Sequence, residues 1–185
     1  MSSAIKHILA VLLLPGIMAV AIPVYILVSS HGLRPGGFQP FPAGFALALV
    51  GLSFAIFGLT LMVKTNTLFA RVGKGTLAPW TPTKHLVVQG IYLHVRNPMI
   101  TGVFCILAGE AAAFYSWRLL VWFGIFVLIN MTFIPLFEEP DLEKRFGDDY
   151  RVYKKNVPRW IPLTKPWKPE FGNRKDDGQV NHKSS

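Results

Sequence analysis

The stretch LVVQGIYLHVRNPMITG, from Leu86 to Gly102, decides the fold, because within it a polar loop containing glycine becomes a hydrophobic helix. Asn97 suits the capping position of this helix, and Pro98 suits its first turn, since proline lacks the amide that would have no partner there. Pro98 also pushes the residue before it out of the helical region, so the helix start is defined. Arg96 directly precedes this start. We therefore expect a cation beside free amide groups, an arrangement that suits an anion.

Outward from this stretch, charged residues divide the chain into apolar segments, and 51% of all residues are hydrophobic. Each segment is long enough to cross a hydrocarbon layer of roughly 30 Å, which takes about 20 helical residues. The third segment contains one charge, Glu110, and the others contain none. The sequence predicts an all-α, polytopic membrane protein with four transmembrane helices, lying between His7 and His31, Arg34 and Lys64, Arg96 and Arg118, and from Leu119 to Phe137.

The distribution of Lys and Arg predicts the orientation in the membrane. One lies in the N-terminal segment, five lie from Lys64 to Arg96 and eleven follow Glu138, against only Arg34 and Arg118 in the other connections. By the positive-inside rule, both termini and the loop at 64–95 face the cytoplasm of a multi-pass cell-membrane protein. The net charge of +9 then indicates contact with anionic membrane lipids rather than nucleic acid.

Cysteine and histidine give no support to a metal site. Cys105 is the single cysteine, which excludes a disulfide within the chain and a cysteine-rich metal site. The five histidines show no ligand-like spacing. We therefore expect no metal.

Small residues form one face of the second predicted span, at Gly44, Ala48, Gly51, Ala55 and Gly58. This face allows another helix to approach closely, and it also permits pairing between chains, so the oligomeric state stays open. The loop that follows, at 64–95, has 32 residues, which is long for a connection without a role.

A short turn near Tyr115 to Arg118 predicts that the third and fourth spans form an antiparallel hairpin. Both spans contain about 20 residues, so their far ends return to the same level. The hairpin should bring together residues forty positions apart in sequence: Arg96, Asn97, Glu138 and Glu139. Arg96 and Glu138 could form a simple ion pair there, or they could bind a ligand.

Pro140 predicts the start of a shorter helix with acids in its first turn and lysines near its end. Its apolar stripe comprises Leu142, Phe146, Tyr150, Tyr153 and Val157. We expect this helix to lie at the membrane interface or to pack on the central loop. The predicted organisation is an N-terminal hairpin at 1–63, a core at 64–163 and a disordered basic tail at 164–185.

Two sequence blocks carry a resemblance. LVVQGIYLHVRNPMITG followed by EEPDLEKRFGDDYRVYKKNVPRWIP resembles the integral-membrane methyltransferases that include isoprenylcysteine carboxyl methyltransferases and phospholipid N-methyltransferases. The resemblance covers Lys84 to Pro162, with both blocks in order and properly separated. It implies a methyltransferase that uses S-adenosyl-L-methionine and a lipid-like acceptor delivered from the membrane.

The resemblance also implies positions for the cofactor. Matching cofactor-contacting positions are Lys84, His85, Leu86, Val87, Gly90, Tyr92, Asn97, Pro98, Met99, Ile100 and Glu138. Ile100 replaces a tyrosine that is usual in the family. Ile134 stands where the isoprenylcysteine enzymes have a substrate-binding arginine, which weakens the case for a prenylcysteine carboxylate as acceptor.

The candidate catalytic residues are Arg96 and Glu139. Methyl transfer from a sulfonium starts from an activated donor, so positioning supplies much of the rate. A carboxylate acceptor needs no base, and Arg96 would orient it; an amine acceptor must lose a proton, to Glu139, His94 or Tyr150. Two other functions stay open: a non-catalytic membrane scaffold of the same fold, and a membrane reductase that binds a nicotinamide cofactor.

Overall fold

The computed structural model describes residues 16–29, 40–72 and 86–169. These parts of the chain are helical and contain no strand, which confirms the all-α prediction. The elements in order are η1 (Ile17–Ala21), α2 (Ile22–Ser29), α3 (Ala43–Val72), η2 (Gly90–Leu93), α4 (Pro98–Ala113), α5 (Trp117–Phe133), η3 (Ile134–Glu138) and α6 (Glu139–Asn156).

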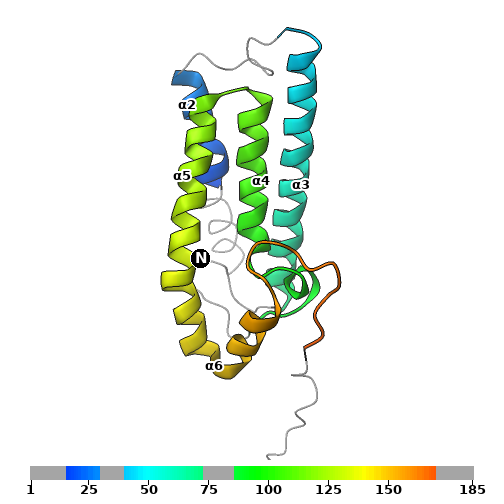
Figure 1. Ribbon diagram of the computed structural model, residues 1–185, viewed down its shortest axis with the longest axis vertical. Coiled ribbons are helices and arrows are strands. Elements are labelled where there is room, and N and C mark those ends of the chain that lie inside the picture. The colour runs from blue at the N-terminus through cyan, green and yellow to red at the C-terminus, as the bar shows by residue number, and fades with distance from the viewer. Residues whose placement is uncertain (1–15, 30–39, 73–85, 170–185) are drawn as a thin grey trace, which may run out of the picture.

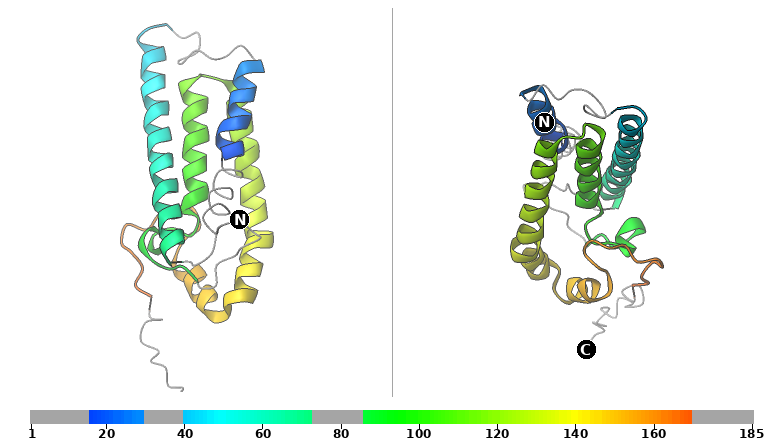
Figure 2. Two further views of the ribbon diagram at one scale, coloured as in Figure 1. Left: turned by 180° about the vertical axis from the view of Figure 1, so that it is seen from behind. Right: turned by 45° about the horizontal axis from the view of Figure 1, so that its top comes forward.

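Three long helices stand side by side, with α4 between α3 and α5 (Figure 1). The turn between α4 and α5 is short: Ser116 precedes α5, and its hydroxyl accepts a hydrogen bond from the Leu119 amide. This confirms the predicted hairpin. At the opposite end α6 crosses below the bundle, and η2 and the chain after α6 lie there too (Figure 2). We name this the α6 end of the bundle.

Glycines bring α3 and α4 into direct backbone contact. A Cβ added at Gly51 would meet the Gly109 carbonyl, and one added at Gly58 would meet the Gly102 carbonyl, each closer than 3.0 Å. The two pairs are seven residues apart on each helix and run antiparallel, so one continuous face of α3 contacts α4. The small-residue face is therefore confirmed as a packing surface within the chain.

The N-terminal helices pack against α4 and α5. Ala19 belongs to a core cluster with Val103, Leu107 and Phe126, and the Trp122 indole donates to the Met18 carbonyl over 3.2 Å. The rest of the first predicted span lies outside the described residues.

Two helices are long and apolar enough to cross a membrane, Ala43–Leu68 and the continuous helix Trp117–Asn156. The described part of the first span, Ile17–Ser29, and the third span, Pro98–Ala113, are shorter apolar helices. Sixteen residues extend only about 24 Å. Because α4 packs between α3 and α5, its apolar residues are explained by the protein core as well as by a membrane. The structure therefore supports two candidate membrane helices.

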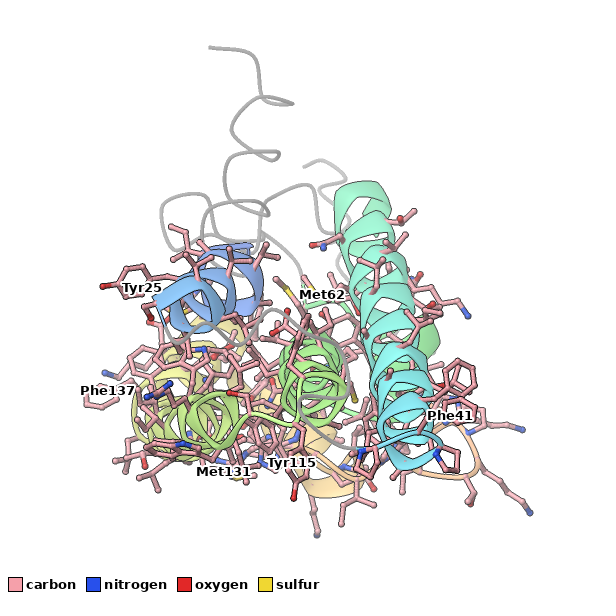
Figure 3. All side chains as sticks on the ribbon, turned by 90° about the horizontal axis from the view of Figure 1, so that it is seen from above. Tyr25, Phe41, Met62, Tyr115, Met131 and Phe137 are labelled. Carbon is pink, nitrogen blue, oxygen red and sulfur yellow. The ribbon has the colours of Figure 1, made fainter. Side chains whose placement is uncertain are left out.

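Large apolar side chains on α3 and α5 point outward. Leu59 and Leu128 are 57% and 68% exposed. Figure 3 shows Tyr25, Phe41 and Phe137 at the rim of the molecule, whereas Met62 points between the helices. So large an apolar surface is typical of lipid contact. In water it would be a region of aggregation.

Helix α5 does not stop before Pro140. It continues through η3 directly into α6, and forty residues in one helix would extend about 60 Å, twice the hydrocarbon thickness. The uncharged part ends at Phe137, so α6 lies outside the membrane-spanning segment. The sharp change of direction comes at Gly147, with φ 58° and ψ −133°, a conformation that favours glycine.

The apolar stripe of α6 packs on the central loop, as predicted. Tyr150, Tyr153 and Val157 are buried and contact Leu86 and Val88. The Leu163 amide, at the end of the predicted core, donates to the His94 carbonyl over 2.9 Å. The Trp167 amide, within the predicted tail at 164–185, donates to the Leu93 carbonyl over 2.9 Å. Residues up to 169 are thus attached to the fold, and 170–185 lie outside the described residues.

Candidate functional site

Arg96 connects three segments of the chain at the α6 end. Its Nη1 donates to Glu139 Oε1 over 2.8 Å, and its Nε donates to the Val157 carbonyl over 2.8 Å. Its backbone amide donates to the Pro158 carbonyl over 3.0 Å. The hairpin therefore brings the start of α4 and the start of α6 together, as expected. The partner in the ion pair is Glu139, however, and not Glu138.

Glu139 is the centre of a buried charged cluster. Its side chain is 2% exposed, and Arg159 Nε donates to Oε1 over 2.6 Å while Lys154 Nζ lies 3.2 Å from Oε2. We name Glu139, Arg96, Lys154 and Arg159 the Glu139 cluster. Burial alone would raise the pKa of Glu139, but the hydrogen bond from Arg159 and the charges of Arg96 and Lys154 outweigh it and lower the pKa below its ordinary value. Glu139 is therefore ionised and a poor proton acceptor.

Tyr150 is equally unsuited to accept a proton. Burial is the main cause that raises its pKa to about 12, and the neighbouring Glu139 charge adds to it. Tyr153, beside it on α6, donates its hydroxyl to the Tyr92 carbonyl over 2.8 Å. These tyrosines attach α6 to η2 and fix the loop before α4.

Tyr92 and Glu138, two of the predicted cofactor residues, lie near each other. The pKa of Tyr92 is raised well above its ordinary value by burial first, then by Tyr153 and the Glu138 charge. Unlike Glu139, Glu138 is exposed, and no ion pair or hydrogen bond of its carboxylate occurs among the described residues. Glu138 is thus available to a ligand, whereas Glu139 is paired with three cations, although its Oε2 has no hydrogen-bond partner within the described residues.

Several buried polar atoms at the α6 end have no hydrogen-bond partner within the described parts of the chain. Two are donors, Asn97 Nδ2 and Trp160 Nε1, and two lie near the end of α3, Thr65 Oγ1 and Asn66 Oδ1. Unsatisfied buried polar groups cost free energy and are rare, so a cluster of them indicates a missing ligand or water. Asn97 occupies the capping position of α4, but its side chain makes no capping hydrogen bond. The amide that we expected to cap the helix remains available.

The other predicted cofactor residues are distributed around this cluster. Val87 and Pro98 are buried, Leu86, Met99 and Ile100 are half-buried, and Gly90 is exposed with φ 57°. Lys84 and His85 lie outside the described residues. The described ranges hold no group of three or more His, Cys, Asp or Glu side chains that would suit a metal ion.

Sequence reasoning missed Lys154, Arg159 and Trp160 as parts of the site. Arg159 belongs to the quoted motif NVPRWIP, but no role was assigned to it. The pairing of a glutamate with Arg96 could have indicated them, because a buried carboxylate requires several partners and Arg96 supplies only one. Trp160 packs on Phe104 with ring centroids 5.2 Å apart, and no local sequence pattern indicates that contact.

These groups fit the polar parts of S-adenosyl-L-methionine. The Asn97 and Trp160 donors suit its carboxylate, and the Glu138 carboxylate suits its ammonium group or ribose hydroxyls. Asn97, Trp160 and Glu138 are each adjacent in sequence to a member of the Glu139 cluster, namely Arg96, Arg159 and Glu139.

Comparison with known proteins agrees with this geometry. A family model described as phospholipid methyltransferase matches residues 42–149, which include α3, α4, α5 and the first part of α6. An uncharacterized protein of Haemophilus influenzae is 48% identical over 44 residues, which is 23% of this chain and 70% of that protein.

Proposed function

Because this chain belongs to the phospholipid methyltransferase family, we propose that it transfers a methyl group from S-adenosyl-L-methionine to the amine headgroup of a membrane lipid. The proposal is carried by the Asn97 donor at the start of α4 and the Trp160 donor after α6, together with the Glu138 carboxylate at the start of α6, which has no partner among the described residues. The ion pair of Arg96 Nη1 with Glu139 Oε1, 2.8 Å apart, connects the starts of α4 and α6, so the site is built before a ligand binds.

Two residues favour an amine over a carboxylate acceptor. Ile134, in the place of an arginine, is 2% exposed and cannot pair with an anion. The Arg96 guanidinium, which would have to orient a carboxylate, is occupied by Glu139 and the Val157 carbonyl. No described cation at the start of α4 is therefore left to bind an acidic acceptor.

S-adenosyl-L-methionine, when bound, supplies a methyl group that is already activated on a sulfonium. The residues of this chain then need to position and desolvate the two reactants. An amine must lose a proton for its lone pair to react. Glu139 and Tyr150 are unsuited to take it, and His94 lies at the groove with Nδ1 on the Leu163 carbonyl, so we propose that the proton leaves to solvent at the exposed edge beside Glu138.

Calorimetric titration of the full chain in detergent tests cofactor binding. We expect Asn97→Ala and Glu138→Gln each to weaken binding about tenfold, the effect of one hydrogen bond to a charged group. Matched controls are Asn156→Ala, whose amide bonds within its own helix, and Asp148→Asn on the exposed side of α6. Both controls should bind as the wild type does. Absence of binding to folded wild-type protein would instead favour a scaffold.

Methyl transfer itself is tested with donor labelled in its methyl group and a total lipid extract. We expect label in lipids with an amine headgroup, and label in a carboxyl ester would contradict the acceptor class. Competition by a nicotinamide cofactor, with no effect of S-adenosyl-L-methionine, would favour the membrane reductase.

A further inference from the structure

A second candidate site lies on the other side of the α4 start from the Glu139 cluster. It is a groove of about 440 Å³, lined chiefly by Phe57 and Leu61 of α3, Ile91 and His94 at η2, Thr101 of α4, and Pro162. Neighbouring residues before α4 contribute to different sites. Val95 and Pro98 line the groove, whereas the Arg96 side chain pairs with Glu139. The groove therefore adjoins the proposed methyl-transfer site at Pro98, a predicted cofactor position, and extends from there along α3.

The groove continues the apolar outer surface of α3. Phe57 is 58% exposed and lies within the candidate membrane helix Ala43–Leu68. The lining is apolar apart from His94 and Thr101. Inside a hydrocarbon layer, an open apolar groove of this size has no favourable water structure, and its walls gain dispersion contacts only when an apolar chain fills it. The environment supplies one such occupant, a lipid acyl chain.

Basic groups stand where the groove leaves the hydrocarbon region. Lys64 is three residues after Leu61 and seven after Phe57, so it shares their face of α3, and it is exposed. Lys165 follows Pro162 in the segment attached to η2. No residue that lines the groove is acidic.

His94 lies at the wall of the groove with a fixed orientation. Its Nδ1 lies 2.7 Å from the Leu163 carbonyl, which can only accept, so Nδ1 carries the proton. This bond holds the imidazole against the segment after α6, so His94 contributes ring carbons, and no polar atom, to the groove's lining.

We propose that this groove binds one acyl chain of an anionic phospholipid, whose phosphate lies near Lys64 and Lys165. The proposal assigns the groove to lipid binding itself, with no methyl transfer required, so it goes beyond the proposed function. The bound lipid contacts η2 and the start of α4 from the side opposite the Glu139 cluster.

Photocross-linking tests the location without any substitution. The full chain, reconstituted in vesicles of phosphatidylcholine with a small fraction of phosphatidylglycerol bearing a diazirine in its acyl chain, is irradiated and its peptides are mapped. We expect adducts concentrated at Phe57, Leu61 and Ile91. Adducts spread evenly over the outer face of α3, including Leu59 and Leu52, would overturn the proposal.

Native mass spectrometry in detergent tests the stoichiometry and the charge preference, with no methyl donor present. We expect one bound phosphatidylglycerol per chain, in preference to phosphatidylcholine with the same acyl chains. Leu61→Trp should fill the groove and abolish this binding, whereas Leu59→Trp, on the exposed face of the same helix, should retain it. Lys64→Gln should lower the preference for the anionic lipid about fivefold, and Lys155→Gln on α6 should not.

Two results would overturn the proposal here. One is equal retention of both lipids by the wild type. The other is retention of phosphatidylglycerol by Leu61→Trp with helix content and melting temperature like the wild type. Methyl transfer enters neither measurement, so a failure of this proposal is distinct from a failure of the proposed function.

Discussion

At the scale of single residues, two adjacent glutamates have different roles because their surroundings differ. Glu139 is buried and bound by three cations, whereas Glu138 is exposed with no partner among the described residues. A buried carboxylate that holds Arg96, Lys154 and Arg159 together stabilises the fold. An exposed carboxylate beside unsatisfied donors suits a ligand.

Replacing Glu139 by glutamine should destabilise the protein by about 3 kcal/mol, because it leaves the nearly buried Arg96 without its carboxylate partner and removes an ion pair of Lys154 and of Arg159. Thermal unfolding in detergent, followed by circular dichroism, measures the change. Asp148→Asn removes an exposed ion pair with Arg151 and should leave the unfolding temperature unchanged. An unfolding temperature of Glu139→Gln equal to that of the wild type would show that the cluster contributes nothing.

The lowered pKa of Glu139 predicts a pH dependence of stability. In the unfolded chain the pKa of a glutamate is about 4.3. Its folded pKa is lower, so the stabilisation is complete above the unfolded value and is lost as the pH falls toward the folded pKa. Unfolding temperatures should drop below roughly pH 4. The drop should be smaller in Glu139→Gln, and the same slope in both proteins would contradict this assignment.

At the scale of elements, glycines determine how α3 and α4 meet and where α6 bends. The pairs Gly51 with Gly109 and Gly58 with Gly102 allow backbone contact along a continuous face. Gly147 permits a change of direction that places Tyr150 and Tyr153 against the central loop. The site therefore depends on residues that make no contact with a ligand.

Gly58→Ala should destabilise the protein by about 1–3 kcal/mol, because the added Cβ would meet the Gly102 carbonyl and the side chain of Ile106 and force the helices apart. Gly124→Ala on α5 is the matched control, since nothing lies within 4 Å of its added Cβ. The control should be unchanged or slightly more stable. Equal unfolding temperatures for the two variants would show that α3 and α4 do not pack this closely.

Gly147→Ala tests the bend in α6. A side chain at φ 58° and ψ −133° is strained, at a cost of about 1–3 kcal/mol, and the second half of the helix should lose its fixed orientation. We expect a lower unfolding temperature together with faster proteolysis after Lys154 and Lys155. A variant as stable and as resistant as the wild type would indicate a helix without this bend.

At the scale of the whole molecule, the outer surface is apolar and the α6 end is charged. The outward faces of α3 and α5 are typical of lipid contact, and the Glu139 cluster, Glu138 and the proposed lipid groove all lie where α3 ends and α4 begins. This arrangement would place the proposed methyl-transfer site beside membrane lipid. It is consistent with the family to which the chain belongs.

An integral position in the membrane predicts resistance to extraction. Washing membranes with alkaline carbonate removes proteins held by surface charge but not those with spanning helices, so we expect the full chain to stay in the membrane pellet. High salt should likewise release none of it, although the chain has a net charge of +9. Release by carbonate would contradict the assignment of Ala43–Leu68 and α5 as spans.

The sequence by itself determined the helical class, the hairpin of α4 and α5, the small-residue face of α3 and the apolar stripe of α6. These features depend on local composition and periodicity, which act over a few helical turns. It also identified the family, because both motif blocks are continuous in the chain. The number of spans was not determined in this way, because α4 is apolar both as a core helix and as a membrane helix.

Only the tertiary structure decided which glutamate pairs with Arg96, where α6 bends, and which polar atoms remain without partners. Glu138 and Glu139 are adjacent acids, and one helical step of about 100° decides which one faces the core. That rotation follows from the π-helical segment η3 and the packing of α6 on the loop before α4. Arg159 and Trp160 join the site through contacts with residues 20 and 56 positions away, Glu139 and Phe104. Contacts over such distances depend on the whole fold, and no local pattern records them.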